Sequence, residues 1–437
     1  MLWLFYNILF AACFLALLPR FLWRMKRRGG YLRHFLQRFG LYEKSLAKAL
    51  GSGRIWIHAV SVGEVFVALR FMEEVRRRRP EAQFVLSVTT STSHALADGK
   101  RAAGDLLIYF PLDFPFIVRG ALRAICPRAL VLVECELWPN LIRQARRRGI
   151  PVVLINGRVS AHSYAGYRKL RIFTRPLLAL VDLLCVQGEE DRSRLADLGA
   201  DPARIHVMGT AKYDDRPAAG GGGRDRAAGL LAAAGVDPAR TVLLGGSTWA
   251  GEEEVLLDLY RDLRVRFPGL FLVLAPRHAE RAPQVLGVIE SRGLTVRRRT
   301  RLADRPAGGP PDVLLVDTTG ELRDFYAAAA IIFVGKSLTR HGGQNIIEPA
   351  CFGKAVIVGP NMENFSSVMP DFLGAGAILQ VADAAGLRNA VEELLSNPAR
   401  REALGRRALD VVQARSGVAA RTADRLVPVL FGGGSRV

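Results

Sequence analysis

The sequence is poor in the residues that build disulfide scaffolds and metal centres. It has five cysteines and seven histidines in 437 residues, and it contains no D-x-D pair of the kind that holds a metal under a diphosphate. The cysteines stand in apolar runs without paired or metal-ligand spacing, so we expect reduced core residues and a cytoplasmic body. A disulfide-rich secreted fold is excluded, and we expect neither a metal nor a cofactor. The cysteines are Cys13, Cys126, Cys135, Cys185 and Cys351.

Acidic residues are missing from the N-terminal segment, where Glu43 is the first. Residues 1–18 carry no charge and would reach roughly 27 Å as a helix, just short of the ~30 Å hydrocarbon core. Cations follow this run, an order opposite to that of a signal peptide, and they place the rest of the chain on the cytoplasmic side. We therefore expect an anchor helix over residues 1–19 in the inner membrane. A buried hydrophobic helix is the alternative.

Cations and aromatic residues alternate over residues 20–50, which we expect to lie at the membrane interface. The chain has 61 Lys and Arg against 41 Asp and Glu, a net charge of +20, which indicates an anionic partner. No nucleic-acid recognition motif accompanies these charges, so an anionic membrane surface is the expected partner and nucleic acid is not. The cations are Arg20, Arg24, Lys26, Arg27, Arg28, Arg33 and Arg38.

Short apolar runs alternate with helical patterns from residue 54 onward, which predicts parallel sheets covered by helices on both faces. The glycine-rich stretch around residues 216–229 divides the alternation into two halves. We expect an α/β fold with two Rossmann-like, doubly wound domains facing across a cleft, over residues 51–215 and 236–425. Residues 216–235 would be the linker, residues 385–397 and 399–425 closing helices, and residues 426–437 a tail. Strands are expected at 54–61, 83–90, 105–111, 129–136, 151–157, 183–187, 205–209, 241–248, 270–276, 312–318, 331–337 and 355–360.

Ligands of such sheets bind at the carboxyl ends of the strands, so the residues that follow each strand are the candidate site. The first half offers carboxylates and a lysine there. Glu64 begins a helix and is a candidate general base, although a glutamate at that position also stabilises the helix dipole. Glu134 ends an apolar run, where an unpaired charge is costly, so it is a second candidate; a structural salt bridge to a cation is the alternative. Lys212 is a weaker candidate, because its sequence context gives little indication of a role.

The second half offers glycines, donors and one carboxylate, a set suited to a nucleotide. The segment GGQNIIEPA (342–350) follows a buried strand, so we expect free backbone N–H groups and a helix start to bind a phosphate there. Glu348 would accept hydrogen bonds from the ribose hydroxyls. Arg277, directly after another strand, suits a phosphate, and a loop ion pair is the alternative.

Several motifs occur together along the chain, behind the basic N-terminal segment. In combination they resemble the 3-deoxy-D-manno-octulosonic acid (Kdo) transferases of lipopolysaccharide synthesis. The resemblance implies a GT-B fold and a metal-independent, inverting transfer of Kdo from CMP-Kdo to the lipid A precursor lipid IVA. The motifs are HAVSVGE (58–64), ECELWPN (134–140), GTAKYD (209–214), APRHAER (275–281), DTTGEL (317–322) and GGQNIIEPA (342–350).

The resemblance also implies roles for matched residues. Glu64 would be the base on the acceptor hydroxyl, and Glu134 and Lys212 would stabilise the transition state. A larger set would hold CMP: Pro276, Arg277, Thr319, Gly320, Glu321, Asn345, Ile346, Ile347 and Glu348.

The chain departs from the family pattern at four positions in the donor half. GGQNI stands where relatives commonly have GGHNP, so Gln344 and Ile346 differ. Trp249 replaces a histidine and Lys336 a second glycine. These changes leave the reaction class intact and concern the contacts to the donor.

Two other functions fit part of the pattern. Another GT-B glycosyltransferase that uses a UDP-sugar and a lipid acceptor would explain the fold and the charge. In a nucleotide-competition experiment, UDP rather than CMP would then bind to and protect the protein. A membrane-anchored binding protein for anionic lipid or nucleic acid would explain the charge but not the glycine-and-carboxylate loops.

Overall fold

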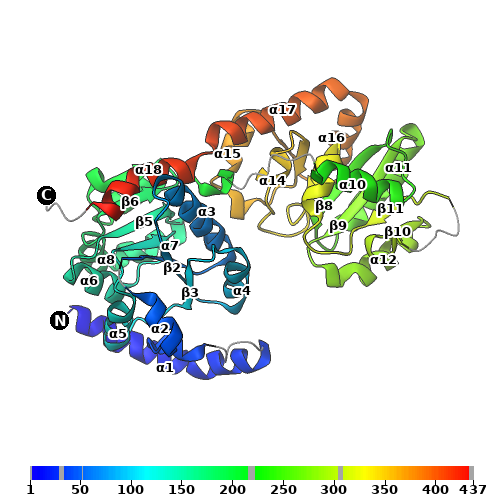
Figure 1. Ribbon diagram of the computed structural model, residues 1–437. Coiled ribbons are helices and arrows are strands. Elements are labelled where there is room, and N and C mark those ends of the chain that lie inside the picture. The colour runs from blue at the N-terminus through cyan, green and yellow to red at the C-terminus, as the bar shows by residue number, and fades with distance from the viewer. Residues whose placement is uncertain (1, 29–33, 52, 215–221, 304–308, 433–437) are drawn as a thin grey trace. The chain divides into compact units, whose positions relative to one another are not determined.

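The structure is a computed structural model, and it describes residues 2–28, 34–51, 53–214, 222–303 and 309–432. The chain forms two compact units (Figure 1). Unit 1 comprises residues 1–214 and 417–437, and unit 2 comprises residues 215–416. Each contains one seven-stranded sheet in which all neighbouring strands are parallel. This confirms the predicted α/β fold with two doubly wound domains.

The sheet of unit 1 has the order β3-β2-β1-β4-β5-β6-β7. Its strands are short runs of Val, Ile and Leu that are buried almost throughout, because apolar residues from helices cover both faces. Each strand lies within a range expected from the sequence. The strands are β1 (Ile55–Ala59), β2 (Phe84–Val88), β3 (Leu106–Tyr109), β4 (Ala129–Val133), β5 (Val152–Gly157), β6 (Leu183–Val186) and β7 (Ile205–Val207).

Helices connect these strands and pack on both faces of the sheet. The α-helices are α1 (Leu2–Arg28), α2 (Lys44–Leu50), α3 (Val62–Arg78), α4 (Ser91–Lys100), α5 (Pro115–Ile125), α6 (Pro139–Arg147), α7 (Ala161–Lys169), α8 (Arg171–Leu178), α9 (Glu189–Asp197) and α18 (Val418–Phe431). Short 3₁₀ turns add η1 (Phe35–Phe39), η2 (Pro202–Arg204) and η3 (Ala211–Asp214).

The sheet of unit 2 has the order β10-β11-β9-β8-β12-β13-β14. Its strands are β8 (Thr241–Thr248), β9 (Leu270–Pro276), β10 (Val296–Arg298), β11 (Val313–Leu315), β12 (Ile331–Val334), β13 (Ala355–Val358) and β14 (Leu379–Gln380). The two edge strands, β10 and β14, were not expected from the sequence. The remaining elements are α10 (Gly222–Ala233), α11 (Glu252–Arg266), η4 (Ala279–Arg281), α12 (Ala282–Glu290), η5 (Arg299–Arg301), α13 (Leu322–Ala328), α14 (Ile347–Ala350), η6 (Glu363–Phe365), α15 (Met369–Gly374), α16 (Ala384–Ser396) and α17 (Pro398–Arg415).

Helix α1 packs along unit 1 through one face. The inward residues recur at helical spacing, and the aromatic rings of Phe10 and Phe14 lie 5.0 and 5.5 Å from that of Phe114. The Tyr6 hydroxyl donates to the buried Asp113 carboxylate at 2.9 Å, and Asn140 donates to the Asn7 amide oxygen at 2.7 Å. The outward residues are exposed apolar side chains: Leu4, Phe5, Ile8, Leu9, Leu15 and Leu17.

Within the described residues, no helix is long and apolar enough to cross a membrane. The anchor over residues 1–19 therefore stays a prediction. The side chains of most expected interfacial cations, Arg20 to Arg33, lie outside the described residues. Arg38 is buried, donates to the Thr89 carbonyl at 2.7 Å and stacks on Tyr109, so the expectation that it faces lipid is wrong.

The last helix belongs to unit 1, which corrects the expected boundaries at the C-terminus. The expected helix over 399–425 is broken at Gly417, whose φ of 81° ends α17 and starts α18. The Asp214 carboxylate accepts the N–H groups of Gly417, Val418 and Ala419 at 2.6–3.1 Å. Leu426 and Leu430 are buried in unit 1 as part of α18. Residues 417–431 are therefore neither part of the second domain nor a free tail.

Two further expectations differ from the structure. Residues 222–233 of the predicted linker form α10, which packs against α13, while residues 215–221 lie outside the described residues. Cys185 is buried as expected, but Cys13 and Cys126 are exposed and are not core residues.

Candidate functional site

Each sheet has one point at which neighbouring strands lead to connections in opposite directions, and such switch points hold the ligands of doubly wound sheets. In unit 1 this point lies between β1 and β4, and in unit 2 between β8 and β12. The residues that follow these four strands include Glu64, Glu134, Trp249 and Lys336. Two separate clusters of polar side chains result, one in each unit.

Glu64 is the third residue of α3, just after the turn from β1, and it is buried. Its carboxylate accepts the N–H groups of Val60 at 2.8 Å and Ser61 at 3.1 Å, while the Ser61 hydroxyl accepts the N–H of Glu64. This capping box holds the carboxylate at the carboxyl end of β1. Each carboxylate oxygen keeps a second lone pair for another donor.

Glu134 follows β4, where its backbone takes a positive φ of 58°. Burial raises the pKa of Glu134 and the neighbouring Glu64 raises it further, whereas Lys212 and Arg158 oppose the shift. Burial lowers the pKa of Lys212, as does Arg158, and Glu134 acts in the opposite direction. The structure thus brings together the three residues expected to be catalytic, from the start of α3, the end of β4 and η3.

Two further side chains belong to this cluster, Glu136 and Asn156, and no role was predicted for either from the sequence. Burial, together with Glu64 and Glu134, raises the pKa of Glu136 to about 7, although the Trp138 indole donates to its carboxylate at 3.1 Å. Asn156, with a φ of 52°, accepts the N–H of Ala211 at 3.0 Å and so fixes the turn that carries Lys212. ECELWPN contained a signal for Glu136, since two carboxylates one residue apart follow a buried strand.

The cluster of unit 2 is organised around Glu252, which is fully buried at the start of α11. Its carboxylate accepts four backbone N–H groups at 2.8–3.0 Å, from Trp249, Lys336, Ser337 and Leu338. These hydrogen bonds tie the loop after β8 to the loop after β12. Gly335 packs so closely on Ser247 and Thr248 that a Cβ atom there would lie 2.4 Å from the Ser247 carbonyl oxygen.

The glycine segment after β12 differs from the expected phosphate loop. The N–H of Gly342 donates to Glu363 and that of Gly343 to the Lys336 carbonyl, so neither is free. The helix that follows, α14, is only four residues long, and its first N–H is taken by the Asn345 side chain at 3.0 Å. Within the described residues, no hydrogen bond uses the N–H groups of Gln344, Asn345 or Ile346.

The other residues expected to hold the nucleotide stand at the end of β9, in the loop after β11 and around α14. Arg277 follows β9, and its N–H donates to the Thr248 carbonyl at 3.1 Å. Glu348 is partly exposed, and its carboxylate lies 3.9 Å from the Arg323 guanidinium. The sequence did not predict this ion pair. Thr319 and Gly320 are exposed in the loop after β11, Pro276 ends β9, and Ile346 and Ile347 are buried.

Glu321 stands in the same loop as Thr319 and Gly320, but its carboxylate is already bound. Arg299 donates to it at 2.6 Å and the Thr318 hydroxyl donates as well. Burial would raise the pKa of Glu321, but these hydrogen bonds outweigh it and lower the pKa. The glutamate therefore positions the loop after β11.

Two of the four departures from the family pattern contact one another. The Lys336 ammonium lies over the Trp249 ring at 5.1 Å, and Lys336 has a φ of 57° that favours glycine. The Trp249 ring also meets His278 edge to face at 5.3 Å, while its buried Nε1 has no hydrogen-bond partner among the described residues. A cation and an unused donor thus lie at the switch point of unit 2.

Comparison with known proteins decides the family. A family model described as 3-deoxy-D-manno-octulosonic-acid transferase (kdotransferase) matches residues 33–215. A 3-deoxy-D-manno-octulosonic acid transferase of Bordetella pertussis is 35% identical over 93% of this chain and 94% of its own length. The enzyme of the same name from Haemophilus influenzae is 32% identical over 92% of each chain. The chain belongs to the Kdo transferase family.

The family confirms the resemblance read from the motifs, and with it a glycosyltransferase of lipopolysaccharide synthesis. Among solved structures, Anabaena Alr3699/HepE in complex with UDP covers 86% of this chain and all of its own, with a TM-score of 0.58 and 11% identity. That likeness shows the fold alone, and it agrees with the GT-B type expected. Within the described residues, no group of three His, Cys, Asp or Glu side chains is placed to hold a metal ion. Independence from metal stays a prediction.

Proposed function

We propose that this Kdo transferase uses CMP-Kdo as donor and the lipid A precursor lipid IVA as acceptor. The observation that carries the proposal is the division of chemistry between the two switch points. Unit 1 gathers carboxylates with Lys212 and Arg158, whereas unit 2 gathers backbone donors, Arg277 and Lys336. An acceptor hydroxyl needs a base, and a nucleotide phosphate needs donors and cations.

In the proposed reaction the bond between the anomeric carbon of Kdo and the phosphate oxygen breaks, and CMP leaves with the electron pair. Arg277 and the N–H groups of Gln344 to Ile346 would stabilise the charge on the phosphate. Glu348 would accept hydrogen bonds from the ribose hydroxyls. Glu64 would take the proton of the acceptor hydroxyl as the new bond forms on the opposite face, which inverts the configuration. Glu134 and Lys212 would stabilise the oxocarbenium-like transition state. No step in this scheme requires a metal ion.

We also propose that the enzyme acts at the cytoplasmic face of the inner membrane. The outward face of α1 supports this, because its exposed Leu, Ile and Phe residues suit an interfacial helix as well as an anchor. The cations that follow in the sequence give the orientation.

The test combines an assay of transfer with binding of the nucleotide. Protein incubated with lipid IVA, Kdo, CTP and a CMP-Kdo synthetase should yield Kdo-lipid IVA by mass spectrometry. We expect Glu64→Gln to lose about a hundredfold or more in turnover while it retains CMP binding, the range for a positioned base. Glu348→Ala should weaken CMP binding by about 1.5 to 3 kcal/mol in calorimetry. Near-native turnover of Glu64→Gln, or protection by UDP rather than CMP, would refute the assignment.

A further inference from the structure

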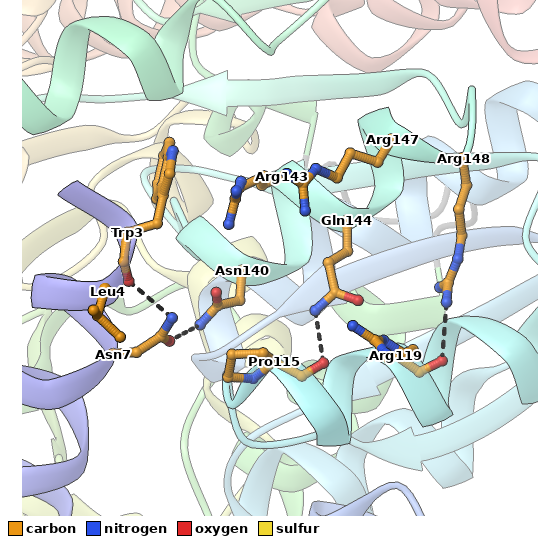
Figure 2. Close-up of a pocket in the computed structure, with 10 residues that line it drawn as sticks. All are labelled: Trp3, Leu4, Asn7, Pro115, Arg119, Asn140, Arg143, Gln144, Arg147 and Arg148. Atoms are coloured by element: carbon orange, nitrogen blue, oxygen red, sulfur yellow. Dashed lines mark hydrogen bonds between the residues drawn. The ribbon is translucent and has the colours of Figure 1, made fainter. Parts of the chain in front are cut away.

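A cavity of about 550 Å³ lies in unit 1 where α1 meets α5 and α6, and none of the catalytic candidates of unit 1 lines it (Figure 2). Its walls come from the first turns of α1, the start of α5 and the length of α6. The buried Asn140 fixes the junction, because its side chain donates to Asn7 at 2.7 Å. The lining residues are Trp3, Leu4, Asn7, Pro115, Arg119, Asn140, Arg143, Gln144, Arg147 and Arg148.

Four arginines line this cavity, and no acidic residue does. Within the described part of the chain, Arg119, Arg143, Arg147 and Arg148 make no ion pair. Arg146, on the same helix but outside the cavity, shows the usual arrangement and pairs with Asp182 at 2.8 Å. The cations of the cavity therefore lack the compensation that this protein gives to a neighbouring arginine.

The arginines lie at the open side of the cavity, where Arg119, Arg147 and Arg148 are exposed and Arg143 is half-buried. Arg143 stacks over the Trp3 ring at 5.2 Å, and an Arg148 nitrogen donates to the Arg119 carbonyl at 3.3 Å. Burial and Arg147 lower the pKa of Arg143, and burial, Arg123 and Arg119 lower that of Arg148. Arg143 is thus coupled to Arg147 and Arg148 to Arg119, and guanidinium groups match the oxygens of a phosphate, to which arginine donates bidentately.

Exposed apolar residues stand on α1 and α5, two of the helices that line the cavity. Leu4 lines it and is 64% exposed, and Phe116, next to the lining Pro115, is 72% exposed. Farther along, the rings of Phe5 and Phe173 lie 6.0 Å apart, beside the exposed Ile172 of α8. A phosphate alone would have no use for this surface, whereas an amphiphile would place its headgroup in the cavity and its acyl chains against these side chains.

We propose that this cavity binds the phosphomonoester headgroup of a membrane lipid. The proposal rests on the membrane association proposed above, and it adds a defined site on α6 to the general attraction of the basic N-terminal segment. Bound there, the headgroup would hold the outward face of α1 in the plane of the lipid surface.

The test is cosedimentation of the full-length protein with three kinds of vesicle. The first kind contains phosphatidylcholine alone. The second also contains phosphatidic acid, which is a phosphomonoester, and the third contains phosphatidylserine instead, in an amount that gives the same total charge. The wild type should bind the phosphatidic acid vesicles most tightly. Arg143→Gln combined with Arg147→Gln should weaken that binding about tenfold or more, because each cation near an anionic surface contributes about fivefold. Arg143→Lys with Arg147→Lys keeps the charge but lacks the guanidinium fork, so it should lose the preference for phosphatidic acid.

The matched control is Arg297→Gln combined with Arg406→Gln, which removes two charges from unit 2. Thermal unfolding of each variant checks that it is folded. Equal loss in the cavity and control variants, or equal binding of the wild type to both anionic vesicles, would overturn the site and leave membrane association standing. A wild type that binds no vesicle would overturn both. Release of the vesicles by millimolar inorganic phosphate at constant ionic strength would assign the cavity to free phosphate instead.

Discussion

The environment of Glu136 in the unit 1 cluster moves the pKa of its carboxyl group into the neutral range. Its pKa is raised to about 7 by burial and by two neighbouring carboxylates, from an ordinary value of 4.5. Folding therefore favours its protonated form, and the stability that this gives is present below about pH 4.5 and lost as the pH rises through 7. Ionised Glu136 destabilises the folded protein above that range.

We expect Glu136→Gln to be as stable as the wild type at pH 4.5 and more stable at pH 8. The gain should be about 1 to 3 kcal/mol, reduced from the full shift because the carboxylate is only partly buried. Urea denaturation at both values checks this, with Glu81→Gln as an exposed control. A gain that does not depend on pH would contradict the raised pKa.

Individual site residues differ in how visible they are in the sequence. Glu64 and Glu134 were found because each stands shortly after a buried strand, at the place where parallel sheets bind ligands. Glu252 was not, because GEEEV reads as an ordinary acidic helix start, whereas its partners at 336–338 lie more than eighty residues away. The contact between Lys336 and Trp249 was hidden for the same reason, although both were noted as unusual.

The junction between α17 and α18 shows how one side chain fixes an element. Asp214 caps α18 from the end of η3 by accepting three N–H groups, and it is itself buried. The first N–H groups of any helix have no carbonyl acceptor within the helix, so the three N–H groups at the start of α18 depend on Asp214. The start of α18 therefore depends on a residue two hundred positions earlier.

We expect Asp214→Ala to destabilise unit 1 by about 2 to 3 kcal/mol, because two buried donors and one partly buried donor lose a charged acceptor. Differential scanning calorimetry should show a lower melting temperature for one transition. Asp201→Ala, which removes an exposed cap from the short turn η2, is the matched control and should cost less. If the two variants lose equal stability, the cap on α18 is not the stabilising contact.

At the scale of elements, the strands were predictable and the boundaries were less so. Continuous apolar runs identify strands that are buried on both faces, which is why those expected over 54–209 and 241–360 were confirmed. The edge strands β10 and β14 have three and two residues, too few for a pattern. The glycine-rich residues 222–233 were assigned to a linker by composition, but packing against α13 stabilises them as a helix.

For the molecule as a whole, the outward face of α1 predicts how the protein partitions onto neutral lipid. Leu9→Ser combined with Leu15→Ser should weaken binding to phosphatidylcholine vesicles about tenfold or more, since each leucine is more than half exposed and free to enter the bilayer. Salt should not alter this loss, because apolar burial is not screened.

Cosedimentation across a salt series measures the effect. Val265→Ser removes an equally apolar side chain, 82% exposed on α11 of unit 2, and should leave vesicle binding unchanged. Unaltered binding of the α1 variant would show that this face does not enter lipid.

The return of the chain to unit 1 has a consequence for the order of folding during synthesis. Unit 2 is one continuous segment, residues 215–416, and its sheet and helices are complete as soon as that segment has left the ribosome. Unit 1 is translated first, yet the surface that receives Leu426 and Leu430 stays uncovered until the last helix emerges. The half of the protein made first is therefore the half that finishes folding last, and a nascent chain stalled before residue 417 leaves an apolar face of unit 1 open to chaperones.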